Sequence, residues 1–188
     1  GSTPPPGQRI AIAQDDAFAF LYSHLMESWK MAGAEISRFS PLADEAPEMN
    51  CDAVFLPGGY PELHAAKIAA NTSFLNGLRN AADRGAFIYG ACGGYMVLGD
   101  GLVDSDGTRH KMAGLLRLET SFATRKLHLG YRVIEQQSDL PIGTKGAGFS
   151  AHEFHYSTAT REEGEPLFRA KDALDQQLGP KGLRSGNV

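Results

Sequence analysis

The sequence predicts an α/β fold built on a doubly wound, mostly parallel sheet, with antiparallel additions in the second half. In the first 100 residues, short apolar runs alternate with segments whose apolar residues recur at helical spacing, a pattern typical of βαβ units. Two of these apolar runs end in glycine-rich turns. From Leu115 onward, strand-like runs follow one another without long helical segments between them, which favours antiparallel pairing at an edge of the parallel core.

Each element is predicted from its local pattern. The segment 17–29, for example, carries large apolar residues three and four positions apart, as one face of a helix requires. The predicted strands are 9–14, 34–39, 53–56, 86–89, 115–123, 129–137, 148–156 and 166–170. The predicted helices are 17–29, 61–70, 73–84 and 93–98, with Asn71 or Thr72 as a cap of the third and Gly99 closing the fourth.

Composition excludes several classes of protein. The formal net charge is −4 and there is no block of like charge, so we expect no nucleic acid and no anionic membrane as partner. No apolar run approaches a membrane span, and no secretory signal pattern is present. The two cysteines have no metal-site spacing. We therefore expect a cytoplasmic protein whose partner is a small molecule or another protein.

The chain is expected to form one domain over 9–188. Residues 1–8 begin with Gly-Ser and continue into a proline-rich run, which is typical of a tag remnant followed by an interdomain linker. The last residues, "GPKGLRSGNV", stop in turn-forming types where an apolar segment is expected. We therefore expect a piece of a longer protein.

The stretch "YGACGGYMVLG" favours Cys92 as a nucleophile. A strand, small residues, one polar residue and then Gly93 at the start of a helix are the pattern of a nucleophile elbow, with cysteine in the place of serine. The helix N-terminus would lower the pKa of the thiol, and the Gly93 amide would be free to bind an oxyanion. The alternative is a buried core thiol, which is the interpretation we favour for Cys51, where no glycine is near.

A second turn, "LPGGYPE", follows the strand expected to neighbour the Cys92 strand. The carboxyl ends of parallel strands meet at one edge of a sheet, so segments 57–62 and 89–94 should face each other. Gly58 and Gly59 would leave backbone amides free to donate there. Taken alone, this motif is equally consistent with a tight turn.

The stretch "HEFHYS" offers a base for Cys92. In an extended segment His152 and His155 point to opposite faces, so only one of them can reach the thiol. The histidine spacing does not fit a helical zinc site, and neither a phosphate-binding loop nor a dinucleotide motif is present. We expect no metal and no cofactor in this domain.

These segments, with "RIAIAQDDAFAFLY" and "FLPGGYPELHAA", together resemble the glutaminase domain of cobyrinate (hydrogenobyrinate) a,c-diamide synthase, a triad-type (class I) glutamine amidotransferase of cobalamin biosynthesis. The resemblance covers nearly the whole chain. It implies a flavodoxin-like, class I amidotransferase-like sheet. It also implies an N-terminal synthetase domain on the same polypeptide that binds ATP, Mg and the corrinoid acid, and a last strand and helix beyond the present end.

The resemblance also assigns roles to residues. Cys92 would be the nucleophile that attacks glutamine, and His155 the general base and acid. The amides of Gly93 and of Gly58 or Gly59 would form the oxyanion hole. Tyr60 and Glu62 are weaker candidates for binding glutamine.

Departures from the family pattern leave alternatives open. Ser157 stands where many triad amidotransferases carry the orienting acid, so either a Cys-His dyad or an acid such as Glu153 must be considered. Ala91 replaces a frequently acidic residue. Rival functions are the glutaminase domain of cobyric acid synthase or of nickel-sirohydrochlorin a,c-diamide synthase, a non-catalytic docking or regulatory domain of the same fold, and an unrelated hydrolase or redox protein with a cysteine elbow.

Overall fold

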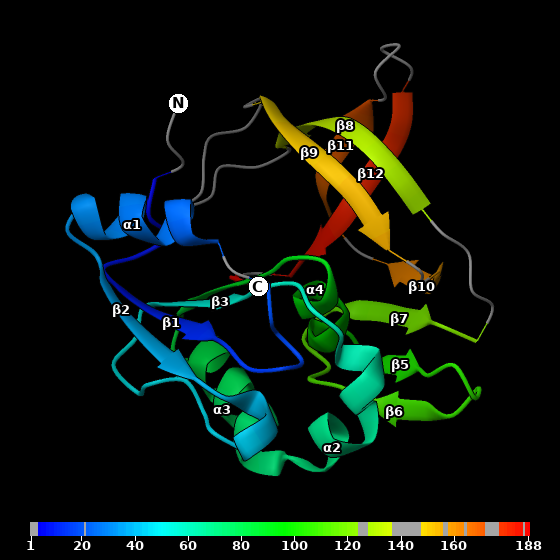
Figure 1. Cartoon of the computed structure of the whole chain (residues 1–188), viewed down its shortest axis with the longest axis horizontal. Helices are drawn as coiled ribbons and strands as arrows, with labels where there is room; N and C mark the ends of the chain where they lie inside the picture. The colour runs from blue at the N-terminus through cyan, green and yellow to red at the C-terminus, as the bar shows by residue number, and fades with distance from the viewer. Residues whose placement is uncertain are drawn as a thin grey trace.

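A four-stranded parallel sheet in the order β2-β1-β3-β4 forms the centre of the first half. Its strands are β1 (Arg9–Ala13), β2 (Glu35–Phe39), β3 (Ala53–Leu56) and β4 (Phe87–Gly90). Figure 1 labels β1, β2 and β3 beside the helices that cover them. The computed structural model describes residues 4–20, 22–123, 128–136, 148–155, 158–163, 165–171, 177–185 and 187–188. From 128 to 182, almost all side chains lie outside the described part.

Both faces of this sheet are buried, which confirms the doubly wound prediction. Alternate residues of β1 and β3 pack into two apolar clusters, one with Met26 and Trp29 of α1, the other with helices α2 to α4. Because strand side chains alternate between faces, an apolar run such as "AVFL" serves both clusters. The helices are α1 (Ser23–Met31), α2 (Ala65–Ala70), α3 (Thr72–Asp83) and α4 (Gly93–Leu98), with short 3-10 turns η1 (Pro41–Ala43) and η2 (Pro61–His64).

The predicted start of the first helix at Ala17 is wrong, since α1 begins at Ser23. Residues 17–20 instead run alongside the glycine turn after β3: Phe20 N–H donates to the Gly58 carbonyl at 3.1 Å, and Tyr60 N–H donates to the Ala17 carbonyl at 3.0 Å. Phe18 lies in the apolar cluster on the opposite face of the sheet from Trp29. The large apolar residues at helical spacing therefore belong to two separate structures, the 17–20 segment and α1.

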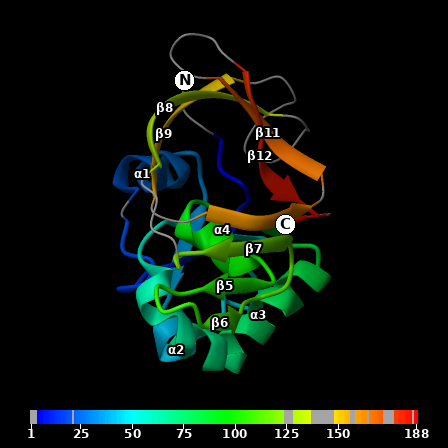
Figure 2. The same cartoon turned by 90° about the vertical axis from the view of Figure 1, so that its right-hand side faces the viewer.

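The expected antiparallel additions are confirmed, but among the described strands they form two further sheets instead of an edge on the parallel one. A mixed sheet in the order β10-β7-β5-β6 packs against α4, as Figure 2 shows for β7 and β5. An antiparallel sheet has the order β12-β11-β8-β9. The strands are β5 (Gly101–Val103), β6 (Arg109–Lys111), β7 (Arg117–Ser121), β8 (His128–Gln136), β9 (Gly148–His155), β10 (Thr158–Glu163), β11 (Glu165–Lys171) and β12 (Gln177–Arg184).

The last residues return to β4. Ile88 N–H donates to the Asn187 carbonyl at 2.8 Å, and the Asn187 side chain donates to the carbonyls of Ala82, at 2.9 Å, and Ala86. These bonds tie the chain end to the free side of β4 and to the end of α3. Within the described residues, no helix is long and apolar enough to cross a membrane.

Candidate active site

Cys92 sits in a strained turn between β4 and α4. Its backbone has φ 49° and ψ −112°, a conformation that a residue other than glycine rarely adopts and that costs about 1–3 kcal/mol. The turn is clamped by two 2.9 Å hydrogen bonds, from Ala91 N–H to the Leu56 carbonyl and from Gly94 N–H to the Ala91 carbonyl. The thiol is exposed, whereas Cys51 is buried as predicted. This is the geometry of a nucleophile elbow.

Glycines allow the elbow to pack against the neighbouring strand. A Cβ added at Gly94 would lie 2.0 Å from the Leu56 carbonyl oxygen, and one at Gly90 would lie 2.6 Å from the Gly94 carbonyl carbon. Neither position therefore accepts a side chain unless the backbone moves. The small residues around Cys92 reflect this close contact between the elbow and β3.

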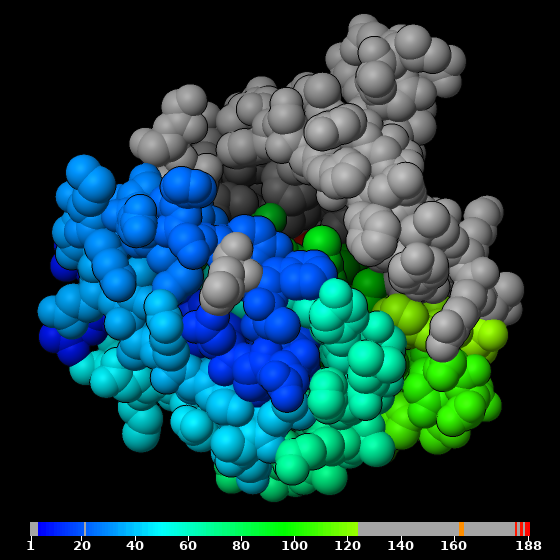
Figure 3. All heavy atoms as spheres, viewed as in Figure 1, coloured from blue at the N-terminus to red at the C-terminus, as the bar shows by residue number. Residues whose placement is uncertain are grey.

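The glycine turn after β3 faces the elbow. A Cβ at Gly58 would lie 3.2 Å from the Cys92 Cβ, and one at Gly93 would lie 3.4 Å from the Gly59 nitrogen. The structure thus brings together the two turns that the sequence predicts to face each other. In the space-filling view of Figure 3, the segment of residues 15–20 (blue) lies beside that of residues 60–65 (turquoise) at the surface.

The orientation of the peptide groups distinguishes Gly59 from Gly58. The Gly58 carbonyl accepts from Phe20 N–H, and in a trans peptide the following N–H points the opposite way. The Gly59 N–H is therefore directed away from the 17–20 segment, toward the side of Gly93. Among the described residues, neither the Gly59 nor the Gly93 amide donates a backbone hydrogen bond. Both amides can therefore bind a developing negative charge.

Two tyrosines lie near Cys92: Tyr22, which the sequence did not predict, and Tyr89, which begins the predicted segment 89–94. The ring of Tyr22 meets Phe55 edge-on at 5.6 Å, and Phe55 stacks on Tyr89 at 5.9 Å. Burial raises the pKa of Tyr89 to about 12, with smaller contributions from the charges of Cys92 and Tyr22. The pKa of Tyr22 is also raised by burial and by the Cys92 charge, against a lowering by the Gly58 amide. Both phenols stay protonated at neutral pH, and the Gly58 N–H faces Tyr22.

The candidates for glutamine binding lie at the rim of the site. Tyr60 is 47% exposed, and its ring meets Phe20 edge-on at 5.6 Å. Glu62 is partly exposed in the first turn of η2. The assignment of Tyr60 and Glu62 to glutamine binding stays a prediction.

His155 and Glu153 lie on β9, where the backbone pairs them with His128 and Gly130 of β8. The side chains of this strand lie outside the described residues. The assignment of His155 as base, and of Glu153 as orienting acid, therefore stays a prediction.

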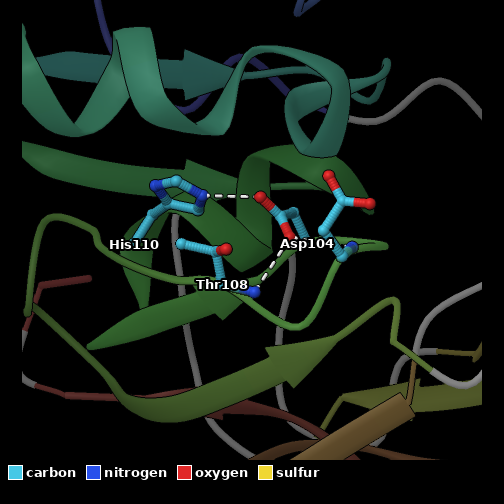
Figure 4. Close-up of polar contacts among 4 residues, drawn as sticks. Asp104, Thr108 and His110 are labelled. Carbon is cyan, nitrogen blue, oxygen red and sulfur yellow. Dashed lines mark hydrogen bonds and ion pairs between the residues drawn. The ribbon is translucent and has the colours of Figure 1, made fainter.

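Among the described residues, His110 has a defined side-chain partner. His110 Nε2 lies 2.8 Å from Asp104 Oδ2, and Asp104 Oδ1 accepts from the Thr108 amide at 3.0 Å (Figure 4). The hydrogen bond from His110 and that from Thr108 lower the pKa of Asp104. This cluster closes the turn between β5 and β6. Among the described side chains, no group of three histidine, cysteine or carboxylate residues could hold a metal ion.

Comparison with solved structures identifies the fold. A crystal structure of a glutamine amidotransferase superposes with a TM-score of 0.56 at 16% identity, covering 87% of this chain and 84% of that one. A chain of the PurLQS structure from Thermotoga maritima superposes with a TM-score of 0.62 at 18% identity, covering 97% and 84%. The fold is that of the glutamine amidotransferases.

Sequence comparison assigns the chain to one family of glutamine amidotransferases. Residues 9–188 match the CobB/CobQ-like glutamine amidotransferase domain, and the chain belongs to that family. It is 57% identical over 185 residues to hydrogenobyrinate a,c-diamide synthase of Brucella abortus, covering 98% of this chain and 42% of that protein. It is 53% identical over 189 residues to the enzyme of the same name from Rhizobium meliloti, covering 100% and 43%. The chain thus spans less than half the length of these relatives, which carry a further part on the same polypeptide.

Proposed function

We propose that this domain hydrolyses glutamine through a Cys92 thioester and supplies ammonia for amidating the a and c acetate side chains of hydrogenobyrinate or cobyrinate. The observation that carries the proposal is the contact between the Cys92 elbow and the Gly58-Gly59 turn. A nucleophile and unpaired amides that face one site are what acyl transfer requires. The identity of 53–57% to hydrogenobyrinate a,c-diamide synthases supports this acid over the substrates of cobyric acid synthase or nickel-sirohydrochlorin diamide synthase.

In the proposed mechanism, the Cys92 thiolate attacks the side-chain carbonyl carbon of glutamine and forms a tetrahedral oxyanion. The amides of Gly59 and Gly93 donate to that oxygen, and losing one such donor typically lowers the rate by about 10²–10³-fold. His155 protonates the departing nitrogen, so that ammonia leaves and a thioester remains. His155 then takes a proton from the water that attacks the thioester, and collapse of the second tetrahedral intermediate releases glutamate and regenerates the Cys92 thiolate beside protonated His155.

The remaining steps are assigned to the rest of the polypeptide. We propose that this further part is a synthetase domain that binds ATP, Mg and the corrinoid acid and receives the ammonia. No residue of the present chain is assigned to those ligands. A cytoplasmic location follows from this biosynthetic role.

The experiment compares glutamine and ammonia as nitrogen donors in the full-length enzyme. Cys92→Ala and His155→Ala should each lower glutamine-dependent amidation by several orders of magnitude, because acyl transfer loses its nucleophile or its proton carrier. Amidation from added ammonium should be unchanged, because it bypasses this domain.

The matched control is Cys51→Ala, which removes the buried cysteine and should leave both activities intact. Loss of ammonia-dependent amidation in the His155 variant would mean that the histidine is structural. Retention of glutamine-dependent amidation in the Cys92 variant would refute the proposal.

A further inference from the structure

Asp15, directly after β1, makes an unusually complete set of hydrogen bonds. Its Oδ1 accepts from the backbone N–H groups of Ala17 at 2.9 Å and Phe18 at 3.2 Å. Its Oδ2 accepts from Ser40 Oγ and Leu42 N–H, both at 2.8 Å. An ionised carboxylate has about four acceptor positions, so this one is fully used. Asp15 thus joins the 17–20 segment to the turn that follows β2.

The 17–20 segment in turn holds the glycine loop opposite Cys92. Phe20 N–H binds the Gly58 carbonyl, and the Ala17 carbonyl binds Tyr60 N–H. The two peptide groups that flank Gly59 are therefore both fixed by this segment. A Cβ at Gly59 would lie 2.3 Å from the Ala17 oxygen, so the two backbones are in direct contact.

These contacts connect Asp15 to the proposed oxyanion hole. The Asp15 carboxylate fixes the amides of Ala17 and Phe18. The 17–20 segment then fixes the two peptide groups around Gly59. The orientation of these peptide groups directs the Gly59 N–H toward the Gly93 side of the elbow. Without the Asp15 carboxylate, the N–H groups of Ala17 and Leu42 would lose their acceptor, and Phe18 N–H would keep only the Asp15 main-chain carbonyl, at 3.1 Å. Apart from the turn bond from Phe18 N–H to the Asp15 carbonyl, the described residues show no helical or sheet bond within the 17–20 segment that could replace the carboxylate.

We propose that Asp15 is a positioning residue for glutamine hydrolysis, acting through the 17–20 segment to direct the Gly59 amide at the oxyanion. This inference rests on the proposed function of the domain. Asp15 does not act on glutamine itself. Its effect should therefore fall on the step in which the oxyanion forms, and not on the nucleophilicity of Cys92.

The test separates these two steps in the full-length enzyme. Asp15→Ala should lower kcat for glutamine by about 10²-fold, the magnitude expected for one misdirected oxyanion donor, while KM changes little. Asp15→Asn keeps one acceptor oxygen and should fall between Asp15→Ala and wild type. Alkylation of Cys92 by iodoacetamide forms no oxyanion, so its rate should match wild type in both variants. Ammonia-dependent amidation should also be unchanged.

The control is Asp104→Asn, because Asp104 accepts from the amides of Asp106 at 2.9 Å and Thr108 at 3.0 Å and contacts His110 in the turn between β5 and β6. It should lower the melting temperature without lowering kcat. The proposal is overturned if Asp15→Asn keeps wild-type kcat, or if alkylation and turnover fall together, as loss of the local fold would cause. If Asp15→Ala does not fold, Asp15→Asn decides. Absence of Cys92-dependent glutamine turnover in the wild type would instead overturn the proposed function.

Discussion

Cys92 is exposed and strained, and the phenols of Tyr22 and Tyr89 lie close enough to respond to its charge. Strain of this kind persists only where the surroundings enforce it, and here the bonds from Ala91 and Gly94 do so. The raised pKa values of the two phenols keep them neutral over the working pH range. They can therefore donate hydrogen bonds in the site and carry no competing negative charge beside a thiolate.

The Tyr89 environment predicts a specific alkaline destabilisation. The hydroxyl has a pKa of about 12 in the folded protein and about 10 when unfolded, so the folded state holds its proton longer. Its contribution to stability is complete below pH 10 and is lost as the pH rises toward 12, by about 1.4 kcal/mol per pH unit at most.

Urea unfolding of the wild type and of Tyr89→Phe at several pH values measures this contribution. As the pH rises from 10 to 12, the free energy of unfolding of Tyr89→Phe should fall less than that of the wild type, because the variant has no phenol to ionise. The difference between the two proteins at pH 8 reports the loss of the neutral hydroxyl, without its ionisation, and serves as the internal control. If the free energy of unfolding of the two proteins has the same pH dependence above pH 10, the raised pKa of Tyr89 is contradicted.

At the scale of single residues, the sequence predicts those candidates whose neighbours in the chain form a recognisable pattern. Cys92 and the glycines are found because an elbow needs small neighbours in a fixed order. The choice between Gly58 and Gly59 could not be predicted, because it depends on which peptide the Phe20 amide binds. Tyr22 was missed because its sequence neighbours suggest a helix, while its role comes from Phe55 and Gly58, which follow more than 30 positions later.

At the scale of elements, the site depends on the contact between the elbow and the end of β3. The Leu56 carbonyl accepts from Ala91 N–H and also lies where a side chain at Gly94 would point. The same contact therefore holds the elbow and excludes a Cβ.

Gly94→Ala tests this contact. Its methyl group would lie 2.0 Å from the Leu56 oxygen, so β3 or α4 must shift, at a cost of about 1–3 kcal/mol or more. We expect glutamine-dependent activity to fall sharply together with the free energy of unfolding.

The control is Gly33→Ala, where φ is +96° and an added Cβ would meet no described atom within 4 Å apart from its chain neighbours. Backbone strain should cost about 1–2 kcal/mol there without loss of activity. Full turnover by Gly94→Ala would show that the elbow does not need this close approach.

Element boundaries show where local patterns fail. Asn71 or Thr72 was expected to cap α3, but Thr72 is already its first residue and the Asn71 side chain donates to the carbonyls of Pro41 and Leu42. Asp44 accepts from the Phe74 amide instead. The short strands β5 and β6 were missed because "GLV" and "RHK" are too brief to show a period of two. The position of Asn71 and the pairing of β5 and β6 both depend on contacts between segments that the local pattern does not contain.

At the scale of the whole molecule, the parallel sheet brings its carboxyl ends together and so creates the site. The alternation of strands and helices predicts this half of the fold, because each βαβ unit is local. The arrangement of the later strands in two separate sheets was not predictable, because it depends on long-range pairing such as β5 with β7 and β7 with β10.

The central claim is that Cys92 is the nucleophile of a glutamine site. It is tested most directly by treating the protein with 6-diazo-5-oxo-norleucine, a glutamine-like electrophile, and mapping the adduct by mass spectrometry. Cys51 is the internal control, since it is buried and burial raises the pKa of its thiol. We predict an adduct on Cys92 alone, suppressed by glutamine. Equal labelling of both cysteines, labelling that glutamine does not suppress, or no labelling in the full-length enzyme would contradict the claim.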